Sequence, residues 1–292
     1  MCIKIISYLP RGRECWGDVL PRLAAGKIIW ITGASSGIGE ELAYQLSRRG
    51  AKLILSARRE EELERVRRAC ASPDLHKVLT LDLVDIAAMP SKVEAALSFF
   101  GKVDILVNNG GVSMRGLAIE LPLELDRRIF EIDFFGTVAL TKAVLPTMIE
   151  SHSGYIVNVC SVAGKVAPPF RSTYAAAKHA LIGYMDALRC EVNQYGISVT
   201  NICPGFINTP SSKNAIAADG QPFGKTDDDI AGGMPVQQCV ATIVSAMESK
   251  KREVIVARGI ALVSYHLRRL FPNTFLKLFQ READRRISTF ER

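Results

Sequence analysis

Long apolar runs are missing from this sequence of 292 residues. No stretch approaches the roughly eighteen consecutive apolar residues that a helix needs to cross a bilayer, so we expect no transmembrane segment. The opening residues, Met1 to Pro10, have an apolar character, but they are too short to span a membrane and lack a small-residue cleavage site. They suit either the stub of a longer membrane anchor or a docked terminal arm.

Paired cysteines are also missing. The seven cysteines are odd in number and scattered, with no CxxC pair and no histidine at metal-ligand spacing. This usage argues against a zinc site or a disulfide framework, and it favours a reduced intracellular protein. The sequence also lacks internal repeats and any recognisable nucleic-acid module, so we do not expect nucleic acid as a partner.

The chain has enough apolar residues to bury the core of one large α/β domain, because 48% of its residues are hydrophobic. The net charge is +7, and the basic excess lies largely near the C-terminus. Such an excess fits an anionic membrane surface, a nucleic acid or no more than solubility. We expect an N-terminal arm at 1–26, a single domain at 27–257 and a basic amphipathic extension at 258–292.

A phosphate-binding pattern opens the domain. The β-branched run Lys27 to Thr32 leads into the glycine-rich segment Gly33 to Gly39, and helical patterning follows from Glu40 to Arg49. Glycines let the backbone approach a phosphate, and a helix N-terminus favours an anion. A second strand at Lys52 to Ser56 would close a βαβ unit, which is the context that such a glycine pattern needs.

An acidic residue is missing at the end of that second strand. A carboxylate there would bind the free 2′-hydroxyl of NAD, whereas a basic residue accommodates the 2′-phosphate of NADP. The chain has Arg58 and Arg59, and its first carboxylate is Glu60, so we predict NADP. The alternative is that both arginines only cap the next helix or pair with Glu61 and Glu62.

Strands and helices alternate along the rest of the domain. Further strands are expected at 78–81, 104–107, 154–159, 198–202 and 253–257, and further helices at 60–71, 86–100 and 125–149, the last kinked or ended by Pro146. This order predicts an α/β fold: a Rossmann-type doubly wound parallel sheet of about seven strands with helices on both faces. The irregular segment 206–233 is expected to be a substrate lid or a disordered insertion.

A phenol and an ammonium stand four residues apart in the alanine-rich segment that starts at Ser172, which is a good N-capping residue. On a helix, Tyr174 and Lys178 would share one face. A cation roughly 4 Å from a phenol contributes about 4 kcal/mol to the phenolate at an effective dielectric of about 20, enough for acid–base chemistry near neutral pH. The pattern YxxxK also occurs by chance in many chains.

Together, TGASSGIG (from Thr32), NNGG (from Asn108), Ser161, YAAAK and PGFINT (from Pro204) resemble the short-chain dehydrogenase/reductase family. The resemblance covers roughly 27–257 and includes a branch whose members are usually membrane-associated. It implies that Tyr174 is the general acid in carbonyl reduction and that Ser161 binds the substrate carbonyl. Lys178 would make the phenol more acidic and hold the nicotinamide ribose.

The same resemblance implies a set of cofactor contacts along the cleft. Ser36 and Ile38 would lie along the pyrophosphate, Asp82 near the adenine, Asn108 by the adenosine ribose and Thr209 at the carboxamide. The full set expected to bind the dinucleotide is Gly33, Ser35, Ser36, Gly37, Ile38, Gly39, Arg58, Arg59, Asp82, Asn108, Gly110, Tyr174, Lys178, Pro204, Gly205, Ile207 and Thr209.

One departure from the family bears on catalysis. Its fourth catalytic residue is an asparagine, and the matching position in EIDFFGT is Asp133, whereas NNGG in place of NNAG removes no functional group. An ionised aspartate can accept the asparagine's hydrogen bond, but its charge would oppose a phenolate and favour a protonated Lys178. We therefore expect a displaced pH optimum or weaker turnover relative to an Asp133→Asn variant.

These features predict an NADP-dependent oxidoreductase that acts on a ketone or secondary alcohol of an apolar, lipid-like molecule. The alternative is a dinucleotide-binding scaffold that has lost efficient chemistry through Asp133. The tail is expected to touch a membrane peripherally, to close the pocket or to join subunits, since a basic amphipathic segment suits an anionic surface. The family implies a homo-oligomer, and the protein is expected in the cytoplasm or at endoplasmic reticulum-type membranes.

Overall fold

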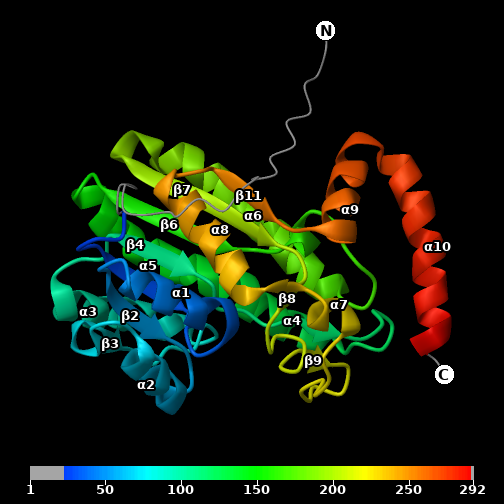
Figure 1. The fold of residues 1–292 in the computed structure, drawn as a ribbon, viewed down its shortest axis with the longest axis horizontal. Coiled ribbons are helices and arrows are strands. Elements are labelled where there is room, and N and C mark those ends of the chain that lie inside the picture. Colours follow the sequence, from blue (N-terminus) through cyan, green and yellow to red (C-terminus); the bar gives the residue numbers. More distant parts are fainter. Residues whose placement is uncertain (1–22, 291–292) are drawn as a thin grey trace, which may run out of the picture.

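A parallel sheet of seven strands forms the centre of the computed structural model, which describes residues 23–290 (Figure 1). The strand order is β11-β7-β6-β4-β1-β2-β3, so the predicted doubly wound fold is confirmed. The strands are β1 (Ile28–Thr32), β2 (Lys52–Ser56), β3 (Lys77–Val78), β4 (Ile105–Asn108), β6 (Gly154–Val159), β7 (Ile197–Pro204) and β11 (Glu253–Val256). Of the arm expected at 1–26, residues 1–22 lie outside the described part.

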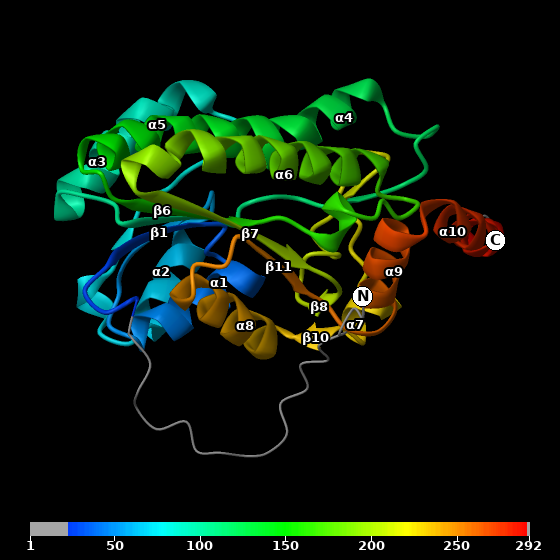
Figure 2. The same ribbon diagram turned by 90° about the horizontal axis from the view of Figure 1, so that it is seen from above.

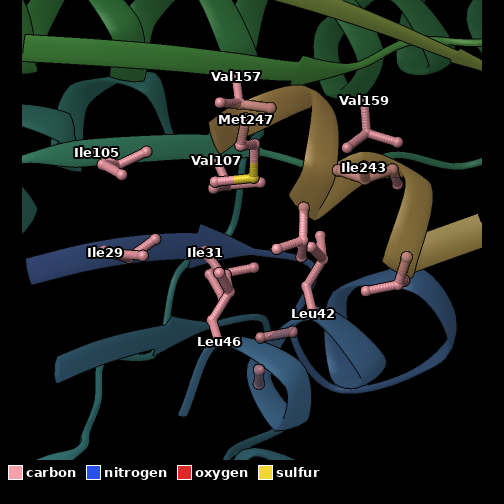
Figure 3. Close-up of a cluster of buried hydrophobic side chains, with 14 of the residues drawn as sticks. Ile29, Ile31, Leu42, Leu46, Ile105, Val107, Val157, Val159, Ile243 and Met247 are labelled. Carbon is pink, nitrogen blue, oxygen red and sulfur yellow. The ribbon is translucent and has the colours of Figure 1, made fainter. Parts of the chain in front are cut away.

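Helices cover both faces of the sheet (Figure 2). One face carries α3 (Met89–Phe100), α5 (Gly136–Glu150) and α6 (Ser172–Val192), and the other carries α1 (Gly37–Ser47), α2 (Glu60–Ala69) and α8 (Val236–Glu248). Successive strand residues point to opposite faces, so Ile29 and Ile31 pack toward α1 and α8, as Figure 3 shows, while Trp30 packs under α3 and α5. Both faces of the strands are therefore apolar.

The third strand is shorter than the predicted 78–81. Only Lys77–Val78 forms a regular strand, although the amides of Leu79 and Leu81 still donate to the carbonyls of Leu55 and Ala57 at 3.0 Å each. The helix predicted at 86–100 begins with a 3-10 turn, η2 (Ile86–Ala88), and continues as α3 with a proline in its first turn. Proline suits that position because the first helical amides have no partner within the helix.

The long helix predicted at 125–149 is interrupted. It consists of α4 (Leu123–Phe130), the five-residue π-helical turn η3 (Glu131–Phe135) and α5, with Pro146 four residues before its end. Within residues 23–290, this run is the one helix long and apolar enough to cross a membrane, but half of its most apolar window is buried in the molecule. Because α5 packs on the sheet beside α3, its apolar side chains belong to the core.

The segment 206–233 is more regular than expected. In it, β8 (Ile207–Asn208) pairs with β10 (Met234–Pro235), and β9 (Ile216–Ala217) pairs with β5 (Met114–Arg115), both in parallel. The short helix α7 (Asp228–Ala231) lies between β9 and β10 in the sequence. Two-residue strands are too short to leave an alternating pattern, which is why the sequence did not reveal them.

The chain ends in two helices beside the main body (Figure 1). They are α9 (Gly259–Leu270) and α10 (Pro272–Phe290), which contact each other, and the Phe275 ring of α10 is buried. The remaining short helices are η1 (Pro73–Leu75), η4 (Val162–Gly164) and η5 (Asn193–Tyr195). The segment expected as a basic amphipathic extension therefore consists largely of two helices.

Candidate functional site

A cavity of about 500 Å³ opens at the carboxyl ends of the central strands. It spans the point between β1 and β4 where the strand order reverses, which is where ligands bind in open α/β sheets. The predicted site residues that line it are Gly33, Ser35, Ser36, Gly37, Ile38, Arg58, Arg59, Asp82, Gly110, Ser161, Tyr174, Lys178, Pro204, Gly205, Ile207 and Thr209. Three predicted residues, Gly39, Asn108 and Asp133, lie behind its wall.

The glycine-rich turn leaves room for a phosphate at one end of this cavity. Gly33 and Gly37 have φ of +65° and +59°, in the left-handed region that favours glycine. A Cβ at Gly39 would collide with the carbonyl oxygen of Gly33, so this glycine lets α1 approach the turn instead of touching a ligand. Because the Ser36 side chain does not cap α1, the first amides of the helix can receive an anion.

The two arginines that follow β2 lie over the same turn. Arg59 Nη2 donates to Ser35 Oγ at 3.3 Å, and both Arg58 and Arg59 line the cavity. In the described residues, Glu62 pairs with Arg65 and neither Glu61 nor Glu62 pairs with these two arginines. The glycine-rich turn and the arginines beside it could therefore hold the phosphates of a dinucleotide.

The resemblance implied that Asn108 lies by the adenosine ribose, but the asparagine of NNGG that lines the cavity is Asn109. Asn108 is buried, and its Nδ2 donates to Thr141 Oγ1 and Asn158 Oδ1 at 2.9 Å each. Its neighbour Asn109 lines the cavity and donates from Nδ2 to the carbonyls of Thr32 and Gly33 at 3.0 and 3.2 Å. Because side chains alternate along β4, Asn108 points into the molecule beside Asn158 of β6. Asn109, directly after β4, connects this strand to the glycine-rich turn through its hydrogen bonds.

Ser161 and Tyr174 both line the cavity, and Ser161 follows β6, on the other side of β1 and β4 from the arginines that follow β2. Ser161 follows β6 in extended backbone, accepts from the amide of Ala163 at 3.0 Å and donates to the carbonyl of Pro204 at 3.5 Å. Tyr174 stands in the first turn of α6. This helix begins at Ser172, but Arg171 occupies the N-cap position in place of the predicted Ser172.

Lys178 shares a helix face with Tyr174, as the spacing predicted. Its Nζ lies 5.6 Å from the centroid of the Tyr174 ring and 3.5 Å from Asp133 Oδ2. Asp133 sits in the π-helical turn, fully buried, and its Oδ1 accepts from the amide of Val112 at 2.7 Å. Such turns are frequent at functional sites.

Burial and the partner's charge have opposite effects on the pKa of each member of this pair. Burial raises the pKa of the Asp133 carboxyl, although the charge of Lys178 opposes this effect. Burial alone would lower the pKa of Lys178, but the charge of Asp133, aided by Tyr174, raises the pKa of Lys178 above its ordinary value. The carboxylate thus keeps the ammonium protonated next to the phenol.

Two cavity-lining arginines were missed by the sequence analysis. Arg115 and Arg171 line the cavity and both contact Asp227 Oδ2. The available signal was a lone basic residue in each of two otherwise uncharged stretches, VSMRGLA and APPFRST. Their shared partner Asp227 is 112 and 56 residues away, so sequence spacing does not bring the three side chains together.

Known proteins resemble this chain along most of its length. The short chain dehydrogenase family model matches residues 27–220. The chain is 43% identical over 295 residues to a dehydrogenase/reductase SDR family protein 7-like from Anopheles gambiae, which covers 99% of this chain and 91% of that protein. It is 40% identical over 263 residues to dehydrogenase/reductase SDR family member 7B from Bos taurus, with coverage of 88% and 81%.

Solved structures share the fold of this chain. A short chain dehydrogenase/reductase from Burkholderia phymatum, in complex with NAD, has a TM-score of 0.74 and 24% identity, and the match covers 84% of this chain and 93% of that chain. At that identity the likeness concerns the fold. With the family match and the close relatives, it establishes that this chain belongs to the short-chain dehydrogenase/reductase family of oxidoreductases.

Proposed function

We propose that this protein is an NADP-dependent oxidoreductase that interconverts a ketone and a secondary alcohol on an apolar, lipid-like molecule. The observation that carries the proposal is one continuous cavity that joins the glycine-rich turn to Ser161, Tyr174 and Lys178. A dinucleotide seated on that turn would extend along the cavity toward the phenol. A substrate carbonyl between the two would meet its proton donor there.

When bound, the dinucleotide supplies the hydride for carbonyl reduction. Tyr174 Oη gives its proton to the substrate oxygen as charge develops there, and Ser161 Oγ donates a hydrogen bond to the same oxygen. Lys178 stabilises the phenolate that remains, and Asp133 holds the Lys178 ammonium in its charged form. Oxidation of an alcohol reverses these proton movements.

The choice of NADP over NAD rests on the basic residues after β2. Arg58 and Arg59 line the cavity where the adenosine ribose would lie, and no carboxylate among the described lining residues follows β2 directly. Each hydrogen bond between a guanidinium and a 2′-phosphate is worth about 1.5–3 kcal/mol. The same positions leave the free 2′-hydroxyl of NAD without an acidic partner.

The test is NADPH oxidation against a panel of steroid, retinoid, acyl and quinone carbonyls, with Tyr174→Phe as the matched variant. The phenylalanine keeps the ring and removes only the hydroxyl, so we expect turnover to fall by about 10²- to 10⁴-fold while NADPH still binds. Turnover that survives the substitution would refute Tyr174 as the proton donor.

A second candidate function is a dinucleotide-binding scaffold with weak chemistry. The buried Asp133–Lys178 pair favours it, because a negative charge near the phenol opposes the phenolate. Tight NADPH binding without turnover on any carbonyl of the panel would favour the scaffold. Tyr174-dependent turnover would favour the enzyme.

We further propose that α9 and α10 can lie on an anionic membrane surface. The protein would then be located in the cytoplasm or, through these helices, at endoplasmic reticulum-type membranes. Exposed apolar side chains at Ile260, Val263 and Leu270 lie near Arg268 and Arg269, a combination suited to acidic lipids. The family resemblance also supports a homo-oligomer, which light scattering of the purified protein tests directly.

A further inference from the structure

Two arginines share one carboxylate at the Tyr174 end of the cavity. Arg115 Nε donates to Asp227 Oδ2 at 2.7 Å, its Nη2 contacts the same oxygen, and Arg171 Nη2 donates to it at 2.8 Å. The three side chains are mostly buried, with exposed fractions of 6%, 22% and 16% for Arg115, Asp227 and Arg171. Two cations against one anion leave an excess positive charge.

That excess faces the substrate end of the cavity. Arg115 and Arg171 line it, whereas Asp227 does not, and the one carboxylate among the described lining residues is Asp82 at the dinucleotide end. Lys178 is matched separately by Asp133. The first turn of α6 contains no acidic residue of its own, although its Thr173 hydroxyl donates to Asp126 of α4. The positive end of the helix dipole lies beside Arg171.

Arg115 and Arg171 differ in the donors that they leave free. Arg115 is fixed by Asp227, by Ser113 Oγ at 2.8 Å and by the carbonyl of Met114 at 2.6 Å. Arg171 makes one side-chain hydrogen bond within residues 23–290, to Asp227, although a guanidinium has five N–H donors. Burial and the charge of Arg115 lower the pKa of Arg171 despite Asp227, so the cation is under-compensated.

We propose that the substrate carries an anionic group, a carboxylate or a phosphate, that binds Arg171 with Arg115 behind it, close to the carbonyl at Tyr174. This inference rests on the proposed function and refines its substrate class from a lipid-like molecule to an amphiphile with an acidic head. A planar guanidinium with free donors suits both oxyanions. Arg171 stands three residues before Tyr174, so head group and reacting carbonyl would be close together.

The cluster also ties the segment 206–233 to the body, because Asp227 belongs to that segment and its arginine partners do not. A cluster that served only as this tie would have no preference for anions. Asp227→Asn separates the two roles, because it removes the competing carboxylate charge and keeps the shape of the side chain. A cluster that recognises anions should bind them more tightly in this variant, whereas a cluster that is only a tie should gain no preference for anions.

The experiment measures binding of octanoate, octyl phosphate and octanol to the NADPH-loaded full-length protein by calorimetry, so that no turnover is required. We expect at least one of the two anions to bind about tenfold or more tightly than octanol, as charge-assisted hydrogen bonds predict. Comparison of octanoate with octyl phosphate shows which oxyanion the site prefers. Equal binding of all three ligands would overturn the inference.

Variants separate recognition from folding. Arg171→Gln should abolish the preference for anions while octanol and NADPH binding persist, Arg171→Lys should keep part of it, and Asp227→Asn should increase it. The exposed Arg128→Gln on α4 lies outside the cavity lining and serves as the matched control. A preference that survives Arg171→Gln would overturn the inference. Absence of carbonyl turnover with intact anion preference would instead count against the proposed function alone.

Discussion

Single residues at the buried end of the cavity are packed tightly around one ion pair. A Cβ at Gly111 would lie 2.8 Å from Asp133 Oδ1 and 3.1 Å from Lys178 Nζ, so the glycine leaves room for the pair. Asp133 Oδ2 is buried and has no hydrogen-bond partner within the described residues, apart from the ionic contact with Lys178. Breaking such a pair at one partner leaves the other charge exposed to a low dielectric.

Asp133→Asn should move the alkaline limb of the pH–rate profile to lower pH. In the native protein Asp133 raises the pKa of Lys178, so the ammonium stays protonated to higher pH than it otherwise would. Removing the carboxylate lowers that pKa, and the ammonium that supports Tyr174 is then lost at lower pH. The measurement is kcat/KM against pH for both proteins. The control is Glu131→Gln in the same turn, and identical profiles for native protein and Asp133→Asn would contradict the assignment.

Gly39→Ala should weaken NADPH binding and reduce stability by about 1–3 kcal/mol, because the new Cβ meets the backbone carbonyl of Gly33 and α1 must move. Thermal unfolding and a fluorescence titration with NADPH measure the two effects. Gly183→Ala in α6 is the matched control, since a Cβ there meets nothing within 4 Å, and alanine should stabilise the helix by about 0.5–1 kcal/mol. Unchanged NADPH affinity in Gly39→Ala would remove the close-approach argument.

Among the elements, α9 differs from the core helices in presenting large apolar side chains outward. Ile260, Val263 and Leu270 are 57–67% exposed, and their spacing puts them along one side of the helix. Phe271, directly after the helix, is 60% exposed. The other side of α9 is anchored, because Ala261 is buried beside Gly205 at the cavity. Deleting the tail would therefore disturb the site as well as the exposed surface, and point substitutions give the cleaner test.

Ile260→Ser, Val263→Ser and Leu270→Ser combined should reduce co-sedimentation with vesicles of phosphatidylserine and phosphatidylcholine. Arg268→Gln with Arg269→Gln should reduce binding only to the anionic vesicles, by roughly fivefold per residue at about 1 kcal/mol each. Ile119→Ser, at a 93% exposed position outside the tail, is the control. Vesicle binding that both sets of tail substitutions leave unchanged would exclude membrane contact through these helices.

For the whole molecule, ligand binding and folding are coupled, because one cavity is lined by residues from the glycine turn near the N-terminus to Ile230 in the second half of the chain. A ligand that bridges these parts stabilises the native state in proportion to its concentration over Kd. The sheet that supports them runs from β1 to β11 and includes nearly the whole domain. Cofactor preference should therefore appear in global unfolding.

NADPH at about 100 times its Kd should stabilise the protein by about 2.7 kcal/mol, which raises Tm by roughly 5–10 °C for a chain of this size, and NADH at the same concentration should do much less. Arg58→Ala with Arg59→Ala should remove the difference between the two cofactors. Arg68→Ala, which affects only a pair with Glu64 on α2, should leave it intact. Equal Tm increases with NADPH and NADH in the native protein would contradict NADP specificity.

Local sequence patterns determined the sheet, the glycine-rich turn and the spacing of Tyr174 and Lys178. Each depends on neighbouring residues: β-branched runs form strands, glycine permits φ near +60°, and residues four apart share a helix face. The alternation of strands and helices predicted a parallel sheet of about seven strands, and the order β11-β7-β6-β4-β1-β2-β3 came from the structure.

Only the tertiary structure decided which side chains meet across the cavity. Arg115 and Arg171 reach Asp227 from 112 and 56 residues away, and Asp133 reaches Lys178 from another helix. The direction of each asparagine in NNGG also depended on how β4 sits between β1 and β6. Such contacts depend on packing between distant elements, and sequence spacing carries no record of that packing.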